Sequence, residues 1–183
     1  MIQAETFNIN KMLENLLVYG FYCFHDKRLE NLLDDSTIWE LQDRENFYHG
    51  INKEAVEKCK EIQIELFKDL HRNIKAIDND KTGISSGIDN YTDVWHNDSR
   101  EQMSIQTLCY QDDLYEGDGG YLELRCYDNI ERKYYPKNGD VMIMNHHNGI
   151  YHRVELLKTN KRRAVINLIF NYEWLENKAR NIP

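Results

Sequence analysis

Residues 94–99, VWHNDS, contain two side chains that could bind a metal ion together. His96 and Asp98 are two positions apart, and on an extended chain such side chains point to the same face. An imidazole nitrogen and a carboxylate oxygen could then reach one cation. Pairs of this kind also arise often by chance in surface turns, so a stable site needs a third ligand.

The third candidate ligand is His152, in the sequence IYHRVE. Two histidines and one carboxylate on one face of a metal leave the opposite coordination positions open, which is typical of non-haem Fe(II) oxygenases. His146 and His147, in NHHNG, are alternatives to His152 as the third ligand, although a polar turn is the simpler interpretation of this pair. Trp95 stands beside the first ligand and is expected to pack rather than to take part in chemistry.

Apolar periodicity predicts helices in much of the first half of the chain. Asn8 is a candidate N-cap, the apolar residues after it recur at helical spacing, and Gly20 ends the pattern. Residues 19–25 predict a short aromatic strand, and residues 26–33 predict a second short helix.

The longest predicted helix begins after Asn52 and continues to about residue 73. Residues 77–93, IDNDKTGISSGIDNYTD, then predict a long polar loop that leads to His96. Loops of this length are often functional or mobile, the ordinary alternative being a plain surface connection. The apolar face of the long helix is formed by Val56, Cys59, Ile62, Leu66 and Leu70.

Runs rich in β-branched and aromatic residues predict strands in the second half. Turn sequences such as GDGG and PKNGD separate these runs, and a spacing of roughly a dozen residues favours a sandwich or barrel over alternating βαβ units. The expected fold class is therefore mainly β, a sandwich backed by N-terminal helices. The predicted strands are residues 103–110, 120–127, 133–136, 140–145, 150–157 and 163–172.

Charge and composition exclude several functional classes. The chain of 183 residues has a net charge of −8, which does not favour nucleic-acid binding. No apolar run approaches the roughly 18 residues of a membrane span, and the N-terminus carries no recognisable signal peptide. The absence of a CxxC pair argues against a zinc ribbon or thioredoxin motif. We expect a cytoplasmic protein with reduced, packed thiols, because free cysteine behaves as a small buried hydrophobic residue. The four cysteines are Cys23, Cys59, Cys109 and Cys126.

Four segments follow the His96–Asp98 pair in a characteristic order: GDGGYLEL, PKNGDVMIMN, YHRV and KRRAVINLIF. In this order the chain resembles the iron(II)- and 2-oxoglutarate-dependent dioxygenases, most closely the prolyl-4-hydroxylase-like branch. The resemblance covers residues 91–173 and implies a jelly roll, or double-stranded β-helix, as the core. The length of 183 residues predicts a single domain, residues 1–183, in which residues 1–75 are mostly helical support.

The resemblance also assigns a role to each matching residue. His96, Asp98 and His152 match the three iron ligands of the family. Tyr110, at the end of the strand after the first two ligands, matches a tyrosine that several relatives place against the cosubstrate carboxylate. A core tyrosine is the ordinary alternative for Tyr110, and Tyr91 is a candidate on the substrate side.

The family holds the far carboxylate of 2-oxoglutarate with a basic residue on its eighth strand, which Arg162 or Arg163 could supply here. The two side chains point to opposite faces of the strand. The face of Arg162 is otherwise apolar, which suits the helix-covered side of a sheet. Relatives carry Thr or Asn four residues after the basic residue, and Asn167 satisfies this only for Arg163. Arg163 is therefore the predicted anchor, with Asn167 as a second cosubstrate contact.

The activity implied by the resemblance is hydroxylation of a C–H bond, in a peptidyl proline or another amino-acid-type substrate. The implied cofactors are Fe(II), 2-oxoglutarate as a small-molecule cosubstrate and O2, with ascorbate as a further candidate. The competing interpretation is a cupin-like metal-binding protein, an isomerase or a small-molecule sensor, without oxygenase activity. A nucleic-acid demethylase of the same superfamily is disfavoured by the net charge of −8.

Overall fold

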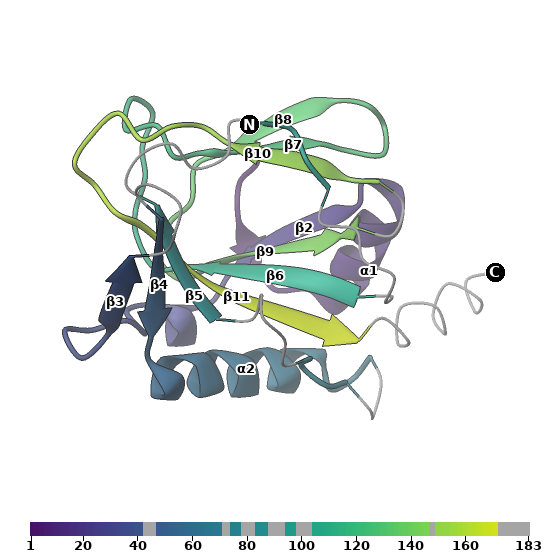
Figure 1. Cartoon of the computed structure of the whole chain (residues 1–183). Coiled ribbons are helices and arrows are strands. Elements are labelled where there is room, and N and C mark those ends of the chain that lie inside the picture. Colours follow the sequence, from purple (N-terminus) through teal and green to yellow (C-terminus); the bar gives the residue numbers. More distant parts are fainter. Residues whose placement is uncertain are drawn as a thin grey trace.

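The computed structural model describes residues 1–41, 47–70, 74–77, 83–87, 94–97, 104–146 and 149–171. These residues form a mainly β fold with two α-helices in the N-terminal half (Figure 1). In chain order the elements are β1 (Glu5–Thr6), α1 (Ile9–Val18), β2 (Phe21–His25), a 3₁₀ turn (Lys27–Leu29), β3 (Ile38–Leu41), β4 (Phe47–Ile51), α2 (Lys53–Phe67), β5 (Gly83–Gly87), β6 (Ser104–Tyr110), β7 (Leu122–Arg125), β8 (Glu131–Tyr134), β9 (Asp140–Asn145), β10 (Tyr151–Val154) and β11 (Arg163–Asn171).

The strands of the described residues form two sheets. The larger sheet has eight strands in the order β1-β2-β9-β6-β11-β5-β4-β3, and the smaller sheet has three in the order β10-β7-β8. Every pair is antiparallel except β1 with β2. In Figure 1 the smaller sheet lies above the larger one, and α2 lies below it. The predicted jelly roll with helical backing is confirmed.

The two helices cover the outer face of the larger sheet. Met12 and Leu16 of α1 and Cys59 and Phe67 of α2 are buried there, in one apolar core with residues of β6, β9 and β11. Alternation along β11 sends Ile166 and its same-face neighbours into this outer core. Neither of these described helices is long and apolar enough to cross a membrane.

Both helices begin where the sequence predicts. The side-chain oxygen of Asn8 accepts a hydrogen bond from the backbone N–H of Lys11 at 3.0 Å. That of Asn52 accepts one from the backbone N–H of Ala55, also at 3.0 Å. Each bond satisfies a backbone donor of the first turn that has no partner within the helix.

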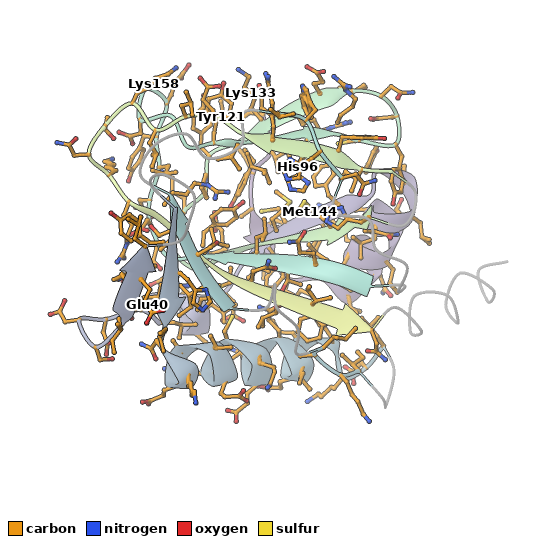
Figure 2. All side chains as sticks on the ribbon, viewed as in Figure 1. Glu40, His96, Tyr121, Lys133, Met144 and Lys158 are labelled. Atoms are coloured by element: carbon orange, nitrogen blue, oxygen red, sulfur yellow. The ribbon has the colours of Figure 1, made fainter. Side chains whose placement is uncertain are left out.

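A second apolar layer lies between the two sheets. It combines Leu122 and Leu124 of β7 with inward-facing residues of the larger sheet, among them Met144 of β9 and Val165 of β11. The side chains of Met144 and His96 both lie in this region (Figure 2). This inner layer is the part of the fold on which the candidate site depends. All four cysteines are free and buried, as expected.

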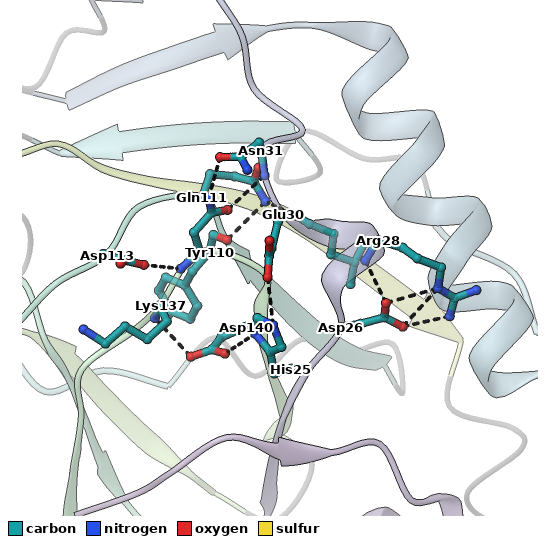
Figure 3. Close-up of polar contacts among 12 residues, drawn as sticks. His25, Asp26, Arg28, Glu30, Asn31, Tyr110, Gln111, Asp113, Lys137 and Asp140 are labelled. Atoms are coloured by element: carbon teal, nitrogen blue, oxygen red, sulfur yellow. Dashed lines mark hydrogen bonds and ion pairs between the residues drawn. The ribbon is translucent and has the colours of Figure 1, made fainter.

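The predicted second helix, residues 26–33, is wrong in extent, since only the turn Lys27–Leu29 is helical. Hydrogen bonds to Gln111 end this helical turn. The amide oxygen of Gln111 accepts a hydrogen bond from the backbone N–H of Leu32 at 2.8 Å, and its amide nitrogen donates one to the carbonyl of Leu29 at 3.0 Å. Asn31 also has a positive φ of 54°. The N–H of Leu32 and the carbonyl of Leu29 are thus bonded to Gln111 rather than within a helix; Figure 3 shows Gln111 beside Glu30 and Asn31 of this segment.

The predicted apolar face of α2 packs against the outer core, with Cys59 and Leu70 buried in it, but the most buried stripe of the helix also includes residues that the sequence did not predict. Its buried stripe is Ala55, Cys59, Gln63 and Phe67, whereas Val56, Ile62 and Leu66 are only partly buried. The burial of Gln63 has a physical reason that periodicity does not show, because its amide nitrogen donates to the sulfur of Cys59 at 3.2 Å. The described helix ends at Phe67, and residues 71–73 lie outside the described part.

The sequence did not predict that the larger sheet extends through β3, β4 and β5. The strand β5 lies inside the segment predicted as a loop, residues 77–93, and pairs with both β4 and β11. Its Ile84 is fully buried against the outer core. The chain packs closely at this point, because a Cβ at Gly50 would stand 2.7 Å from Cγ2 of Ile84. Residues 78–82 and 88–93 lie outside the described part.

Candidate active site

His96 and His152 lie side by side on the inner face of the smaller sheet. Their backbones form one antiparallel bridge, in which the N–H of His96 donates to the carbonyl of His152 at 3.0 Å and the N–H of His152 donates back at 2.9 Å. The centroids of the two imidazole rings are 4.1 Å apart. Directly paired residues of antiparallel strands point to the same face, so both rings can approach one ligand.

The strand β10 explains why the bridge forms and where the rings point. It is an edge strand of the smaller sheet, so its outer backbone groups can pair with residue 96. Burial alternates along it: Tyr151 is exposed, whereas His152 and Val154 are buried. Because Val154 belongs to the inner layer, the side chain of His152 points into that layer as well.

The ring of His96 is oriented by a backbone carbonyl two residues earlier in the chain. Its Nδ1 is 2.9 Å from the carbonyl oxygen of Val94. A carbonyl oxygen can only accept, so Nδ1 carries the proton and Nε2 keeps the lone pair that a metal ion would bind. A hydrogen bond of this kind on the second ring nitrogen is the usual way in which a metal-binding histidine is held.

The third predicted ligand, Asp98, lies outside the described residues, as does His147. Within the described part of the chain, no three His, Cys, Asp or Glu side chains form a group that could hold a metal ion. The structure therefore brings two of the three predicted ligands together, and the role of Asp98 stays a prediction.

His146 lies close to the paired histidines. It is buried, its carbonyl accepts a turn hydrogen bond from the N–H of Gly149 at 3.3 Å, and its ring centroid is 5.5 Å from that of His152. Its Nε2 is 2.7 Å from the side-chain oxygen of Gln106, which requires the proton on Nε2 and removes that atom as a metal ligand. The sequence motifs gave Gln106 no role. The signal for it is the two-residue period of β6, which places Gln106 on the same inward face as Leu108 and Tyr110.

Arg163 stands at the start of β11 and its side chain is buried, with 5% of the residue exposed. Its Nε donates to the carbonyl of Gly120 at 2.9 Å, and its Nη2 donates to the hydroxyl oxygen of Tyr110 at 3.3 Å. The guanidinium carbon lies 5.2 Å from the centroid of the Tyr110 ring. The arginine and the tyrosine that the sequence singled out are therefore in direct contact.

Arg162 points to the other side of the strand. It is exposed and forms an ion pair with Asp112, with Nη2 and Oδ1 3.0 Å apart. Asp112 also accepts a hydrogen bond from the backbone N–H of Ala164 at 2.6 Å. The predicted sidedness of β11 is confirmed, since Val165 faces the inner layer and Ile166 the outer core. The assignment of the cosubstrate anchor to Arg163 stays a prediction.

Tyr110 is held in a buried polar surrounding. Burial raises the pKa of its hydroxyl group to about 12, and the Arg163 guanidinium opposes this increase. The ring packs edge-on against Tyr134, with the centroids 5.7 Å apart. Tyr134 in turn donates to the buried carboxylate of Asp140 at 2.5 Å. Tyr110 therefore stays protonated at neutral pH, with a hydrogen to donate.

Of the two remaining predicted site residues, the structure describes Asn167 but not Tyr91. Asn167 is partly buried on β11, paired with Leu108 of β6 and Gly83 of β5. It shares the strand face of Arg163 because the two are four residues apart. Tyr91, the substrate-side candidate, lies outside the described residues.

The sequence matches no protein-family model and no curated protein sequence. Solved structures do match. An oxidoreductase of the 2OG-Fe(II) oxygenase family from Burkholderia pseudomallei is 11% identical, with a TM-score of 0.68 and 94% of each chain covered. A prolyl hydroxylase from Trichoplax adhaerens, in complex with a peptide fragment of the hypoxia inducible factor oxygen degradation domain, is 14% identical with a TM-score of 0.63. That match covers 93% of this chain and 91% of the other.

A third similar structure is HygX from Streptomyces hygroscopicus with nickel, 2-oxoglutarate and hygromycin B bound. It is 7% identical, with a TM-score of 0.59, and the match covers 91% of this chain and 88% of HygX. At identities this low, the three likenesses show a shared fold over nearly the whole chain.

Proposed function

We propose that this chain is an Fe(II)- and 2-oxoglutarate-dependent dioxygenase that hydroxylates a C–H bond. The observation that carries the proposal is the bridge between His96 and His152, which brings two imidazoles together on the inner layer of a jelly roll. The same fold buries Arg163 in contact with Tyr110. The similar solved structures described above support this class through their shared fold.

The donor chemistry fits Fe(II). Two neutral imidazoles with one carboxylate are the ligand set of mononuclear iron oxygenases, and they leave coordination positions open. His96 and His152 would supply the nitrogens and Asp98 the carboxylate oxygen. The bound iron would supply oxygen activation and the oxidation of the cosubstrate, which side chains alone do not perform.

The residues around Arg163 fit a dicarboxylate cosubstrate. A guanidinium group can form two parallel hydrogen bonds with a carboxylate, and the Tyr110 hydroxyl group can donate a third. Tyr110 keeps its proton because burial raises its pKa to about 12. Asn167, on the same face of β11, would add a polar contact within the inner layer.

The apolar inner layer would limit the access of water to these groups. Leu108, Met144 and Val154 are among the buried residues that form it. In a region of low polarity a charge-assisted hydrogen bond is stronger than in water. The chain itself would thus bind, orient and shield the reactants.

A peptidyl proline or another amino-acid-type compound is the proposed substrate class. The prolyl hydroxylase from Trichoplax adhaerens was solved with a peptide fragment, whereas HygX was solved with hygromycin B. A jelly roll of this type thus accommodates both a peptide and a small molecule, so the fold alone does not select between them. The four buried, free thiols suit a reducing compartment such as the cytoplasm.

The burial of Arg163 favours the oxygenase over a cupin-like isomerase or sensor. Such a protein shares the barrel and the metal-binding histidines but has no need for a guanidinium group inside the inner layer. The discriminating observation is whether 2-oxoglutarate binds at the metal.

The decisive experiment adds 2-oxoglutarate to the anaerobic Fe(II) protein and records the visible absorption spectrum. We expect a new charge-transfer band in the wild-type protein and none in His152→Ala. When O2 is admitted, we expect the protein to convert 2-oxoglutarate to succinate and CO2. In a screen of pooled peptides and metabolites, the pool that contains the substrate should increase the rate of this conversion. An Fe(II) protein whose spectrum 2-oxoglutarate does not change would refute the proposal and favour the cupin-like alternative.

A further inference from the structure

Trp95 lies on the opposite face of the smaller sheet from the two histidines. The bridge between His96 and His152 makes Trp95 the neighbour of Arg153 in the same antiparallel arrangement. Side chains of successive residues on an extended chain point to opposite faces. The indole of Trp95 therefore stands outside, while the ring of His96 points inward.

Two arginines hold the indole in place. The guanidinium carbon of Arg125, from β7, is 4.6 Å from the centroid of the Trp95 ring. That of Arg153, from β10, is 5.0 Å away. Both distances are within the roughly 6 Å range of cation–π attraction, which is strongest for tryptophan. One indole thus ties residue 95 to two strands of the smaller sheet.

The two guanidinium groups are themselves fixed by carboxylates. Nη2 of Arg125 is 2.7 Å from Oε1 of Glu131, and Arg153 forms an ion pair with the buried side chain of Glu123. A carboxylate binds the edge of a guanidinium and leaves its flat face available for an aromatic ring. We call Trp95, Arg125 and Arg153, with their two carboxylate partners, the indole clamp.

The indole clamp acts on the backbone turn that orients the first candidate ligand. The carbonyl of Val94 accepts the Nδ1–H of His96, and Trp95 is the residue between these two. His96 is joined to β10 by the two backbone hydrogen bonds of its bridge to His152. The indole clamp adds contacts from the neighbouring residue, Trp95, to β7 and β10 on the other face of the sheet, and so further restricts the orientation of this turn.

We propose that Trp95 is a positioning residue of the metal site, and that the indole clamp sets the direction in which Nε2 of His96 points. This inference rests on the proposed function, because it takes His96 to be a metal ligand. The resulting arrangement joins the two faces of the smaller sheet: the inner face binds the metal, and the outer face holds the ligand's backbone.

The test compares Trp95→Ala and Trp95→Phe with the wild-type chain of 183 residues. The probe is Co(II) alone, titrated calorimetrically and by its visible absorption, so that no activity measurement is needed. We expect Co(II) to bind roughly 10-fold or more weakly in Trp95→Ala, the usual size of an effect on ligand orientation. Trp95→Phe keeps an aromatic ring between the arginines and should recover most of the affinity. Amide hydrogen exchange at His96 and His152 should accelerate in the metal-free Trp95→Ala protein.

Trp39→Ala is the matched control. Trp39 lies on β3 in the larger sheet, and its ring is 5.3 Å from the guanidinium carbon of Arg162. It therefore loses a comparable aromatic–arginine contact away from the histidines, and should lower the melting temperature without changing Co(II) affinity. If Trp95→Ala does not fold, Arg125→Gln removes one half of the indole clamp at an exposed position and should weaken Co(II) binding by a smaller factor.

The outcomes separate this inference from the function on which it rests. Failure of the wild-type chain to bind Co(II) would overturn the proposed function and this inference with it. Normal binding by the wild-type chain that Trp95→Ala leaves unchanged would overturn the positioning role alone. An equal loss of affinity in Trp95→Ala and Trp39→Ala would also overturn it, because the effect would then reflect general stability.

Discussion

Replacing Arg163 with Ala should weaken the binding of 2-oxoglutarate far more than replacing its neighbour Arg162. The two side chains leave the same strand in opposite directions. The guanidinium of Arg163 is buried and contacts Tyr110, whereas that of Arg162 is exposed and pairs with Asp112. The pair is therefore an internal control: Arg163 begins β11, Arg162 directly precedes it, and the two arginine side chains point in opposite directions.

The expected magnitudes follow from burial. Removing one partner of a buried, hydrogen-bonded charge pair costs about 2–5 kcal/mol, and about 1.4 kcal/mol corresponds to a factor of ten in affinity. Arg163→Ala should therefore raise the dissociation constant of 2-oxoglutarate roughly 30-fold to several thousand-fold. The exposed pair of Arg162 with Asp112 is worth about 0–1 kcal/mol of stability and lies away from the inner layer.

The variant also loses a contact in the folded protein. The carbonyl of Gly120 accepts from Nε of Arg163, and leaving a buried acceptor without this donor costs about 1–3 kcal/mol. A lower melting temperature is therefore expected for Arg163→Ala as well. Arg163→Lys keeps the positive charge but lacks the planar fork, so its affinity for 2-oxoglutarate should fall between those of the wild-type protein and Arg163→Ala.

The assay is anaerobic titration of the Fe(II) protein with 2-oxoglutarate, followed by visible absorption at a temperature well below each melting transition. Circular dichroism shows that every variant is folded under these conditions. A larger loss of affinity in Arg162→Ala than in Arg163→Ala would show that the anchor lies on the other face. Equal, small effects in both would mean that neither arginine binds the cosubstrate.

Three further predictions concern the ligands, the tyrosine and the approach to the metal. The His152→Ala variant should stay folded but lose Fe(II), whereas His146→Ala should retain Fe(II). The reverse result in a metal analysis would show that His146, and not His152, is the ligand. Burial raises the pKa of Tyr110 from 10.0 to about 12, so Tyr110 ionises first in the unfolded state. The free energy of unfolding should therefore fall by up to about 3 kcal/mol as the pH rises from about 10 to 12. In urea titrations at alkaline pH, Tyr110→Phe should lose less stability over this range, and the same pH dependence as in the wild-type protein would contradict the burial argument. On the approach to His96, β5 should be protected from hydrogen exchange in the free protein, because it pairs with β4 and β11 on its two sides; rapid exchange throughout β5 would contradict these pairings.

Several parts of this protein could be predicted from local sequence. The caps Asn8 and Asn52 mark the starts of both helices, because their side chains bond to backbone groups only three residues away. The strand Asp140–Asn145 begins and ends where its apolar run does. The opposite directions of Arg162 and Arg163 follow from the two-residue period of any strand. Each of these features depends on neighbours within a few positions.

Other parts depend on residues that are distant in sequence. The segment 26–33 is helical only at Lys27–Leu29, because Gln111, far along the chain, bonds to the backbone of Leu29 and Leu32. The strand β5 has the composition of a polar loop and becomes a strand because β4 and β11 lie on either side of it.

In the candidate site, too, some features follow from local sequence and others only from the tertiary structure. The residue types of His96, Asp98, His152 and Arg163 and their spacing suffice to propose the chemistry, because donor atoms and charge are properties of the side chains themselves. The 4.1 Å approach of the two imidazoles, the contact of Arg163 with Tyr110 and the position of Trp95 between two arginines exist only in the folded chain. These distances join segments tens of residues apart, and such contacts form only when the burial of two apolar layers compensates the entropy lost in closing the intervening chain.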